Sequence, residues 1–286
     1  MSAEPVEAEP AGSAQADPIA EIAEQLAADS AEPLGLFTRT IATPAAFGDA
    51  RCQYFEFSSR GDRVPGRLLL PKDSAVPAPL ILFQHGRGGS KEAVYLEAAA
   101  PWIRQGAAVA SIDFPLHGER ADAKLSQRLM SADANTALGA DSRELWVEFS
   151  RQAVSDLRRA VDALLSLPDL NGRVAYAAFS LGAIIGTLYC ASDPRPCAAA
   201  LALAGGNLAP REVDPCSHVA RIAPRPILFV NATRDELITR KSTEALYEQA
   251  LEPKRIEWFD AGHTDLPGIA LKEMWLFLRD QLGLGS

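Results

Sequence analysis

Six continuous apolar runs lie between residues 79 and 260, and polar stretches with a helical pattern separate them. Each run has the length of a strand and lacks the alternation of a half-exposed strand, so each is predicted to be covered on both faces. The runs lie at 79–84, 107–114, 173–179, 198–204, 225–231 and 255–260. Strands that alternate with helices favour βαβ crossovers, so an α/β fold with a mostly parallel sheet is predicted.

Two further strands are predicted ahead of these runs. Residues 51–59 alternate between polar and apolar positions and end at the turn sequence "RGDR", and residues 64–71 follow. Together they are typical of an antiparallel hairpin at a sheet edge, which brings the sheet to about eight strands. Amphipathic patterns predict helices at 19–29 and 142–167, and the helices between strands are expected on both faces of the sheet.

Composition and pattern divide the chain into three parts. Residues 1–18 are rich in Ala, Pro and Glu and are predicted to be a disordered acidic tail. A helix and a connecting segment at 19–50 then precede a single domain at 51–286. Two stretches of this domain, 119–140 and 207–223, fit neither pattern. Each follows a strand, so we expect them to lie over the carboxyl ends of the sheet and to shape a pocket there, as a small lid.

Charge and cysteine content exclude several classes of partner. The formal net charge is −9 and there is no basic run, so no nucleic-acid partner is predicted. No stretch approaches the ~18 apolar residues of a membrane span, so no membrane partner is predicted either. The N-terminus lacks the features of a signal peptide and the four cysteines lack CxxC spacing. Reduced thiols and a cytoplasmic location are therefore expected, and oligomeric state is not predicted.

A serine stands at the junction between the run 173–179 and the helical pattern that follows it. The sequence is "AFSLGA", with Ala178 two residues before Ser180 and Gly182 two residues after it. Small residues let the strand and helix backbones nearly touch, and the hydroxyl then stands at a helix N-terminus that favours negative charge. This is the G-x-S-x-G geometry of a nucleophile, with Ala in place of the first Gly. A simple N-cap is the alternative.

A serine hydroxyl needs a base to take its proton and a third group to orient that base. His263, in "FDAGHTDLP", follows the last predicted strand and is the candidate base. Asp235, in "ILFVNATRDEL", follows the strand 225–231 and is the candidate acid. Asp214 and Asp260 are the competing acids, the first on the loop after the preceding strand and the second at the end of the last strand.

Acyl transfer also needs donors for the oxygen that becomes negative. One candidate is the backbone N–H of Leu181, directly after the serine. The second is expected from the glycine-rich loop "QHGRGGSKE" after the strand 79–84, since glycines let the backbone approach a ligand. The N–H of Arg87 is our first candidate in this loop and that of Gly86 the alternative. The side chain of His85 is expected to pack beneath the loop and fix its shape, rather than to act as a second base.

Several of these motifs together resemble the α/β-hydrolase superfamily, and most of all its dienelactone-hydrolase-like and prolyl-oligopeptidase-like serine esterase branch. They are "HGRGGSK", "DFPLHGER", "AFSLGA", "PRPILFVNATRDE" and "AGHTD", in this order, and the resemblance covers about 51–282. It implies the α/β-hydrolase fold and an acyl-enzyme mechanism without metal or organic cofactor. The chain departs from the pattern at Ala178, where Gly is usual. It has Ser180 where true dienelactone hydrolases have cysteine, which weakens the case for that activity.

The substrate-binding candidates are Gly86, His117, Arg120 and Met130. Within "DFPLHGER", Asp113 and His117 also suit a tight structural loop, and Arg120 suits either an anchor for an anionic group or a salt bridge. The spacing of the histidines and Asp113 matches no zinc site, so no metal is predicted.

The function predicted from these residues is a serine hydrolase that cleaves carboxylic esters of small to medium acyl chain. Its partner is then a small-molecule ester, and it needs no cofactor. A thioesterase or a peptidase would use the same three side chains, although the roughly 50 residues before the domain cannot supply the large extra domain that such peptidases usually carry. A non-catalytic binding protein of the same fold is the alternative from another class.

Overall fold

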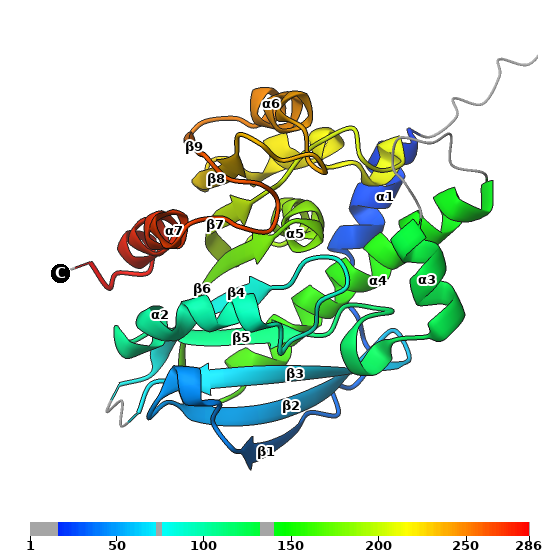
Figure 1. Cartoon of the computed structure of the whole chain (residues 1–286). Helices are drawn as coiled ribbons and strands as arrows, with labels where there is room; N and C mark the ends of the chain where they lie inside the picture. The colour runs from blue at the N-terminus through cyan, green and yellow to red at the C-terminus, as the bar shows by residue number, and fades with distance from the viewer. Residues whose placement is uncertain (1–16, 73–75, 132–139, 286) are drawn as a thin grey trace, which may run out of the picture.

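A nine-stranded sheet runs through the part of the chain that the structure describes (Figure 1). The structure is a computed structural model that describes residues 17–72, 76–131 and 140–285. The strand order is β1-β2-β3-β5-β4-β6-β7-β8-β9. The strands are β1 (Phe37–Ile41), β2 (Arg51–Ser59), β3 (Asp62–Leu70), β4 (Ala78–Gln84), β5 (Ala108–Ile112), β6 (Leu170–Phe179), β7 (Pro196–Ala202), β8 (Ile227–Ala232) and β9 (Lys254–Phe259).

The sheet is mixed, with its antiparallel pairs at one end. Strands β1, β2, β3 and β5 pair antiparallel to one another, and every pair from β5 across to β9 is parallel. The predicted α/β class and mostly parallel sheet are therefore confirmed. Strand β1 was not predicted and lies within the segment 19–50. Its sequence, "FTRTI", leaves four of its five residues exposed, so it carries no buried-face pattern that sequence reading could detect.

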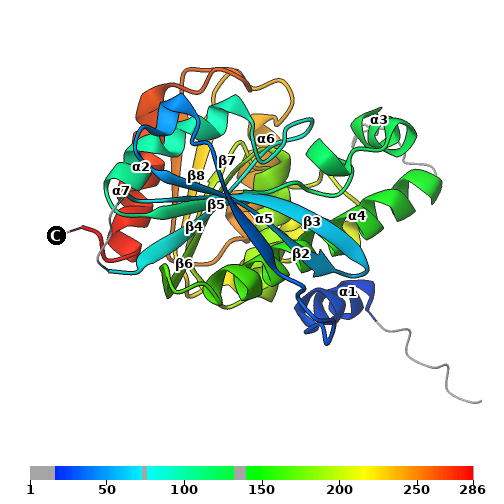
Figure 2. The ribbon, with the colours of Figure 1, turned by 90° about the horizontal axis from the view of Figure 1, so that it is seen from below.

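Helices cover both faces of the sheet (Figures 1 and 2). One face packs against α1, α4, α5 and α6, and the other against α2 and α7, so each face has its own apolar core. The helices are α1 (Pro18–Ala27), α2 (Ala100–Arg104), α3 (Ala123–Ser131), α4 (Ala140–Leu165), α5 (Leu181–Ser192), α6 (Arg240–Gln249) and α7 (Gly268–Gln281). None of the described helices is both long enough and apolar enough to cross a membrane.

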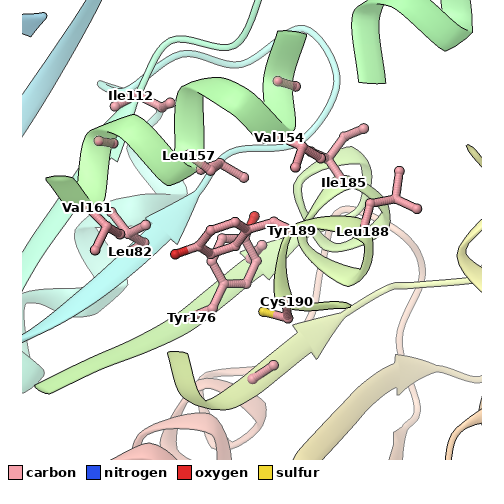
Figure 3. Packing of buried hydrophobic residues seen from close by; sticks show 14 of the residues in the cluster. Leu82, Ile112, Val154, Leu157, Val161, Tyr176, Ile185, Leu188, Tyr189 and Cys190 are labelled. Atoms are coloured by element: carbon pink, nitrogen blue, oxygen red, sulfur yellow. The ribbon is translucent and has the colours of Figure 1, made fainter. Parts of the chain in front are cut away.

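Helix α5, which begins directly after the predicted nucleophile, packs on the sheet beside the ring of Tyr176 (Figure 3). The ring of Tyr176, on β6, fills the space left by the missing side chain of Gly186, since a Cβ there would lie 2.0 Å from that ring. The hydroxyl of Tyr176 donates to the carbonyl of Gly182 at 2.7 Å. A buried aromatic ring and one hydrogen bond thus hold the first turns of α5 against the strand that precedes it.

The described parts of the two predicted insertions contain one helix and several short helical turns. Residues 119–140 contain α3, preceded by the turn η3 (Gly118–Arg120). Residues 207–223 contain three such turns, η4 (Arg211–Val213), η5 (Pro215–Ser217) and η6 (Val219–Ile222). The predicted tail, apart from its last two residues, and residues 132–139 of the first insertion lie outside the described residues. All four cysteines are free thiols.

Candidate active site

Ser180 occupies a strained turn between β6 and α5. Its backbone has φ 52° and ψ −118°, a conformation that costs a non-glycine residue about 1–3 kcal/mol. The surrounding hydrogen bonds hold it there. Its N–H donates to the carbonyl of Ala202 at 2.9 Å, and its own carbonyl accepts from the N–H groups of Ala183 and Ile184 at 2.8 and 2.9 Å. The turn therefore pushes the hydroxyl clear of the sheet, as the motif predicts.

The small residues around Ser180 are required by close backbone packing. A Cβ at Gly182 would lie 2.6 Å from the carbonyl oxygen of His85, so only glycine lets α5 approach the end of β4 this closely. The same hypothetical Cβ would lie 3.1 Å from the Cβ of Ala178. The methyl group of Ala178 thus fits beside glycine at position 182, which explains how this chain has alanine where glycine is usual.

Three predicted side chains meet in one hydrogen-bonded chain. The Ser180 Oγ lies 2.9 Å from Nε2 of His263, and Nδ1 of the same imidazole lies 2.7 Å from Oδ2 of Asp235. These residues follow β6, β9 and β8, so the parallel sheet brings their side chains to one edge. The His263 side chain is 15% exposed and that of Asp235 is 2% exposed. The hydroxyl therefore has a base within bonding distance, and the base has a buried acceptor behind it.

The carboxylate of Asp235 is held in its ionised form. Burial alone would raise the pKa of Asp235, but the hydrogen bond with His263 and those from the backbone N–H groups of Ile238 and Leu237 outweigh burial and lower this pKa below its ordinary value. Both N–H groups donate to Oδ1 at 2.8 Å, which leaves Oδ2 for the imidazole. An ionised Asp235 keeps the Nδ1–H tautomer of His263, so that Nε2 is free to accept the serine proton.

The two competing acids are engaged elsewhere. Asp214 accepts hydrogen bonds from the backbone N–H groups of Leu208, Ala209 and Cys216 and stabilises its own loop. The side chain of Asp260 is 85% exposed and pairs with Arg234. Only Asp235, of the three candidates, contacts the imidazole.

The side chain of His85 fixes the direction of one peptide plane in the glycine-rich loop. Its Nε2 accepts the Phe114 N–H at 3.3 Å, so the ring proton sits on Nδ1 and is donated to the carbonyl of Gly86 at 2.8 Å. The N–H of Gly89 donates to the same carbonyl at 3.1 Å. In a trans peptide the next N–H points opposite to this carbonyl, so these two bonds set the direction of the Arg87 N–H.

One of the two candidate oxyanion donors in this loop already has a hydrogen-bond acceptor. The N–H of Gly86 donates to the hydroxyl of Tyr95 at 2.8 Å, so it is already used. This contradicts Gly86 as the alternative oxyanion donor and leaves Arg87 as the candidate. Leu181 is the first residue of α5, and the first N–H groups of a helix have no partner within it. Sequence reading missed Tyr95, whose only signal is an aromatic residue shortly after the glycine-rich loop.

A cavity of about 640 Å³ opens at Ser180 and His263. Thirteen of its eighteen lining residues are aliphatic or aromatic, so the space beside the serine is largely apolar. These thirteen are Val94, Tyr95, Ala98, Trp146, Phe179, Leu181, Ile184, Leu203, Leu208, Leu237, Ile238, Leu266 and Leu271. From the stretch 207–223 only Leu208 lines the cavity, and no described residue of 119–140 does, so other loops form most of its walls.

Two predicted substrate-binding residues do not line the cavity. The guanidinium of Arg120 pairs with Asp156 at 2.6 Å and with Asp62 at 2.8 Å, so it serves a salt-bridge network and cannot anchor a substrate anion. His117 is buried, and its Nδ1 bonds the carbonyl of Pro115 at 2.8 Å, so it belongs to a tight loop. Gly86 does line the cavity. The side chain of Met130 lies outside the described residues.

The described residues contain no group of three or more His, Cys, Asp or Glu side chains placed to hold a metal ion. His85 and His117 do lie close, with ring centroids 5.3 Å apart, but each ring bonds a backbone carbonyl of its own loop. Burial lowers the pKa of both, that of His85 to about 4. Both rings are therefore neutral structural groups near pH 7.

Comparison with known proteins supports the fold assignment. No family model and no curated protein matches the chain. Among solved structures, an acetyl xylan esterase from Paenibacillus sp. R4 matches with a TM-score of 0.74 and 17% identity, over 95% of this chain and 96% of that one. A cold-adapted esterase from an Arctic intertidal metagenomic library matches with a TM-score of 0.69 and 19% identity, over 87% and 99%.

An acylaminoacyl peptidase matches with a TM-score of 0.59 and 12% identity, over 81% of this chain but 41% of the peptidase. At these identities the likeness establishes the architecture. The chain has the α/β-hydrolase fold, as its motifs predict.

Proposed function

We propose that this protein is a serine hydrolase that cleaves small-molecule carboxylic esters through an acyl-enzyme on Ser180. The observation that carries the proposal is the continuous chain of hydrogen bonds from Ser180 through His263 to Asp235, at the wall of an apolar cavity. An unactivated serine hydroxyl is a weak nucleophile, and this arrangement supplies both a base and its orienting acid. The esterases among the structural neighbours support the same class of reaction.

In the first half of the reaction, Oγ of Ser180 attacks the ester carbonyl carbon while Nε2 of His263 takes the hydroxyl proton. The carbonyl oxygen becomes negative and accepts hydrogen bonds from the N–H groups of Leu181 and Arg87. Collapse of this intermediate breaks the bond to the alcohol, which leaves with the proton from His263. The second half repeats the sequence with water as the nucleophile and releases the carboxylic acid, which returns Ser180 to its starting state.

The cavity favours an apolar ester over an ester of a sugar. Acetyl xylan esterases are among the structural neighbours, but a sugar buried here would face mostly apolar side chains that cannot satisfy its hydroxyl groups. An acyl chain of about two to six carbons would gain from the same walls. Each buried methylene contributes about 0.8 kcal/mol, or roughly a fourfold change in rate when it is realised in the transition state.

A p-nitrophenyl ester series tests this function. We expect kcat/KM to rise from acetyl towards butyryl or hexanoyl, to be low for palmitoyl, and to exceed the rate of acetate release from acetylated xylan. A Ser180→Ala variant should show no activity above background at any chain length. A maximum at palmitoyl would contradict the proposed substrate size. Equal activity of Ser180→Ala and wild type would contradict the proposed reaction.

A further inference from the structure

Tyr95 touches both the glycine-rich loop and the residue before the nucleophile. It lies on the turn η2 (Val94–Ala99) and lines the cavity, with 43% of its surface exposed. Its ring meets that of Phe179 edge-on, with centroids 5.4 Å apart. Its hydroxyl accepts the Gly86 N–H at 2.8 Å. One side chain therefore links the wall of the cavity to the loop that carries a candidate oxyanion donor.

The hydroxyl completes a set of restraints on Gly86. The carbonyl of Gly86 is fixed by His85 and by the N–H of Gly89. The N–H of Gly86 belongs to the preceding peptide plane, and its one hydrogen bond goes to Tyr95. Both peptide planes that flank this residue are thus held by hydrogen bonds, one plane from within the loop and the other by Tyr95. Without the hydroxyl, a buried N–H would lose its partner and the first plane would be free to rotate.

The glycine-rich loop leaves room for the hydroxyl of Tyr95. A Cβ at Gly89 would lie 2.6 Å from the Tyr95 oxygen, so a side chain at that position would crowd the hydrogen bond. The backbone at Gly86 also lies close to the nucleophile, since a Cβ there would be 3.3 Å from the Cβ of Ser180. A small rotation of this loop would therefore change the geometry directly over the serine.

We propose that Tyr95 is a positioning residue for ester hydrolysis. By accepting the Gly86 N–H, its hydroxyl holds residues 86–89 in the orientation in which the Arg87 N–H can stabilise the developing oxyanion. The inference rests on the proposed function. It adds a fourth side chain to the reaction, one that acts through the backbone and that none of the predicted motifs contains.

The test is Tyr95→Phe, which removes the hydroxyl and keeps the ring against Phe179. We expect kcat to fall about tenfold, because the loop then no longer holds the Arg87 N–H towards the developing oxyanion, and KM to change less than about threefold. The affinity for a boronic acid that forms a tetrahedral adduct on Ser180 should fall by about the same factor as kcat/KM, because both depend on the oxyanion donors.

Tyr54→Phe is the matched control. Its hydroxyl donates to Glu56 at 3.0 Å on β2, and the residue does not line the cavity. This variant should keep the wild-type kcat and the wild-type boronic acid affinity. A Tyr95→Phe variant with kcat and boronic acid affinity within twofold of wild type would overturn the proposal. So would a loss of kcat/KM that is entirely a rise in KM.

Amide hydrogen exchange at Gly86 separates this inference from the proposed function, because it requires no turnover. We expect exchange at least tenfold faster in Tyr95→Phe than in wild type, and unchanged in Tyr54→Phe. Unchanged exchange in Tyr95→Phe would show that the hydroxyl does not hold the loop and would overturn the inference. A wild type that hydrolyses no ester would instead overturn the proposed function, while the exchange ratio still decides whether Tyr95 holds the loop.

Discussion

Two clusters of hydrogen-bonded polar side chains lie at the carboxyl ends of the parallel strands. The closed cluster follows β4 and β5 and comprises Lys91, Asp113, Glu119 and Arg120, together with Asp156 on α4. The open cluster follows β6, β8 and β9 and comprises Ser180, Asp235 and His263. Both contain a buried aspartate, but only the open cluster lines the cavity.

The side chains of the closed cluster are all engaged in hydrogen bonds and ion pairs within the protein. The carboxylate of Asp113 accepts from the backbone N–H and the ammonium of Lys91 and from the N–H of Glu119. Burial would lower the pKa of Lys91, but its bonds to Glu119 and Asp113 outweigh burial and raise this pKa above its ordinary value. Arg120 is engaged in the same way with Asp156. Such a network stabilises two loops and leaves no group to exchange a proton with a ligand.

The open cluster has the same kind of buried carboxylate at one end and a serine hydroxyl at the cavity wall at the other. Its side-chain hydrogen bonds are donated in one direction, from Ser180 at the cavity to His263 and from His263 to Asp235. A buried aspartate at a strand end is therefore not enough to identify a catalytic group. What distinguishes the open cluster is that its last member meets a space large enough for a substrate.

The largest expected effect on kcat comes from an isosteric substitution in the open cluster. Asp235→Asn should lower kcat by about 10⁴-fold, because an amide no longer favours the Nδ1–H tautomer of His263 or stabilises its cation. The variant should remain folded at 25 °C, since only one carboxylate with two backbone partners is altered. Steady-state kinetics and circular dichroism measure both quantities.

The matched change in the closed cluster is Asp113→Asn, and the expected effect is on stability. The amide cannot accept all three hydrogen bonds and leaves the buried Lys91 ammonium with less compensation, so the free energy of unfolding should fall by about 3–5 kcal/mol. The kcat of the folded fraction should stay within about tenfold of wild type. Urea unfolding gives the first value. A loss of activity as large as that of Asp235→Asn, without loss of stability, would erase the distinction between the clusters.

His85 connects the two regions, and its buried ring should make stability depend on pH. Burial lowers its pKa in the folded protein to about 4, against about 6.5 for an unfolded chain. Between these values the unfolded state binds the proton and the folded state does not, so stability rises with pH across this window, by at most about 3 kcal/mol. Urea unfolding at pH 4.5 and pH 7 should show a smaller difference in His85→Asn than in wild type. Equal differences would mean that this ring is not the source.

The sequence predicted the parts of the molecule that rest on local chemistry. Five of the six apolar runs predicted parallel strands because a strand buried on both faces needs apolar side chains at most positions. The run 255–260 also forms a parallel strand, β9, but this strand lies at the sheet edge and none of its residues is fully buried, so the expected cover on both faces was wrong there. Ser180 was identifiable because Ala178 and Gly182 are small residues. The close backbone contact around the serine excludes larger side chains at these positions. Asp235 and His263 followed from their places after strands, since a parallel sheet brings such positions to one edge.

The remaining features depend on packing between distant segments. Arg120 faces Asp156 and Asp62 rather than the cavity, and no local pattern reveals which carboxylates will reach a guanidinium. The cavity walls come from loops such as 94–98 and 237–238, whose apolar residues look like ordinary surface or core positions in the sequence. Tyr95 was missed although Gly86 is only nine residues away, because no local pattern reveals which N–H a tyrosine hydroxyl will meet.

The most direct test of Ser180 as an activated nucleophile is covalent labelling with a fluorophosphonate, read by mass spectrometry of the peptide that contains Ser180. We expect one adduct per wild-type chain, located on Ser180, and labelling at least a thousandfold slower in His263→Ala, whose serine remains but whose base is gone. A folded wild type without the adduct, or a His263→Ala variant labelled as fast as wild type, would contradict the claim that this hydroxyl is activated by the imidazole beside it.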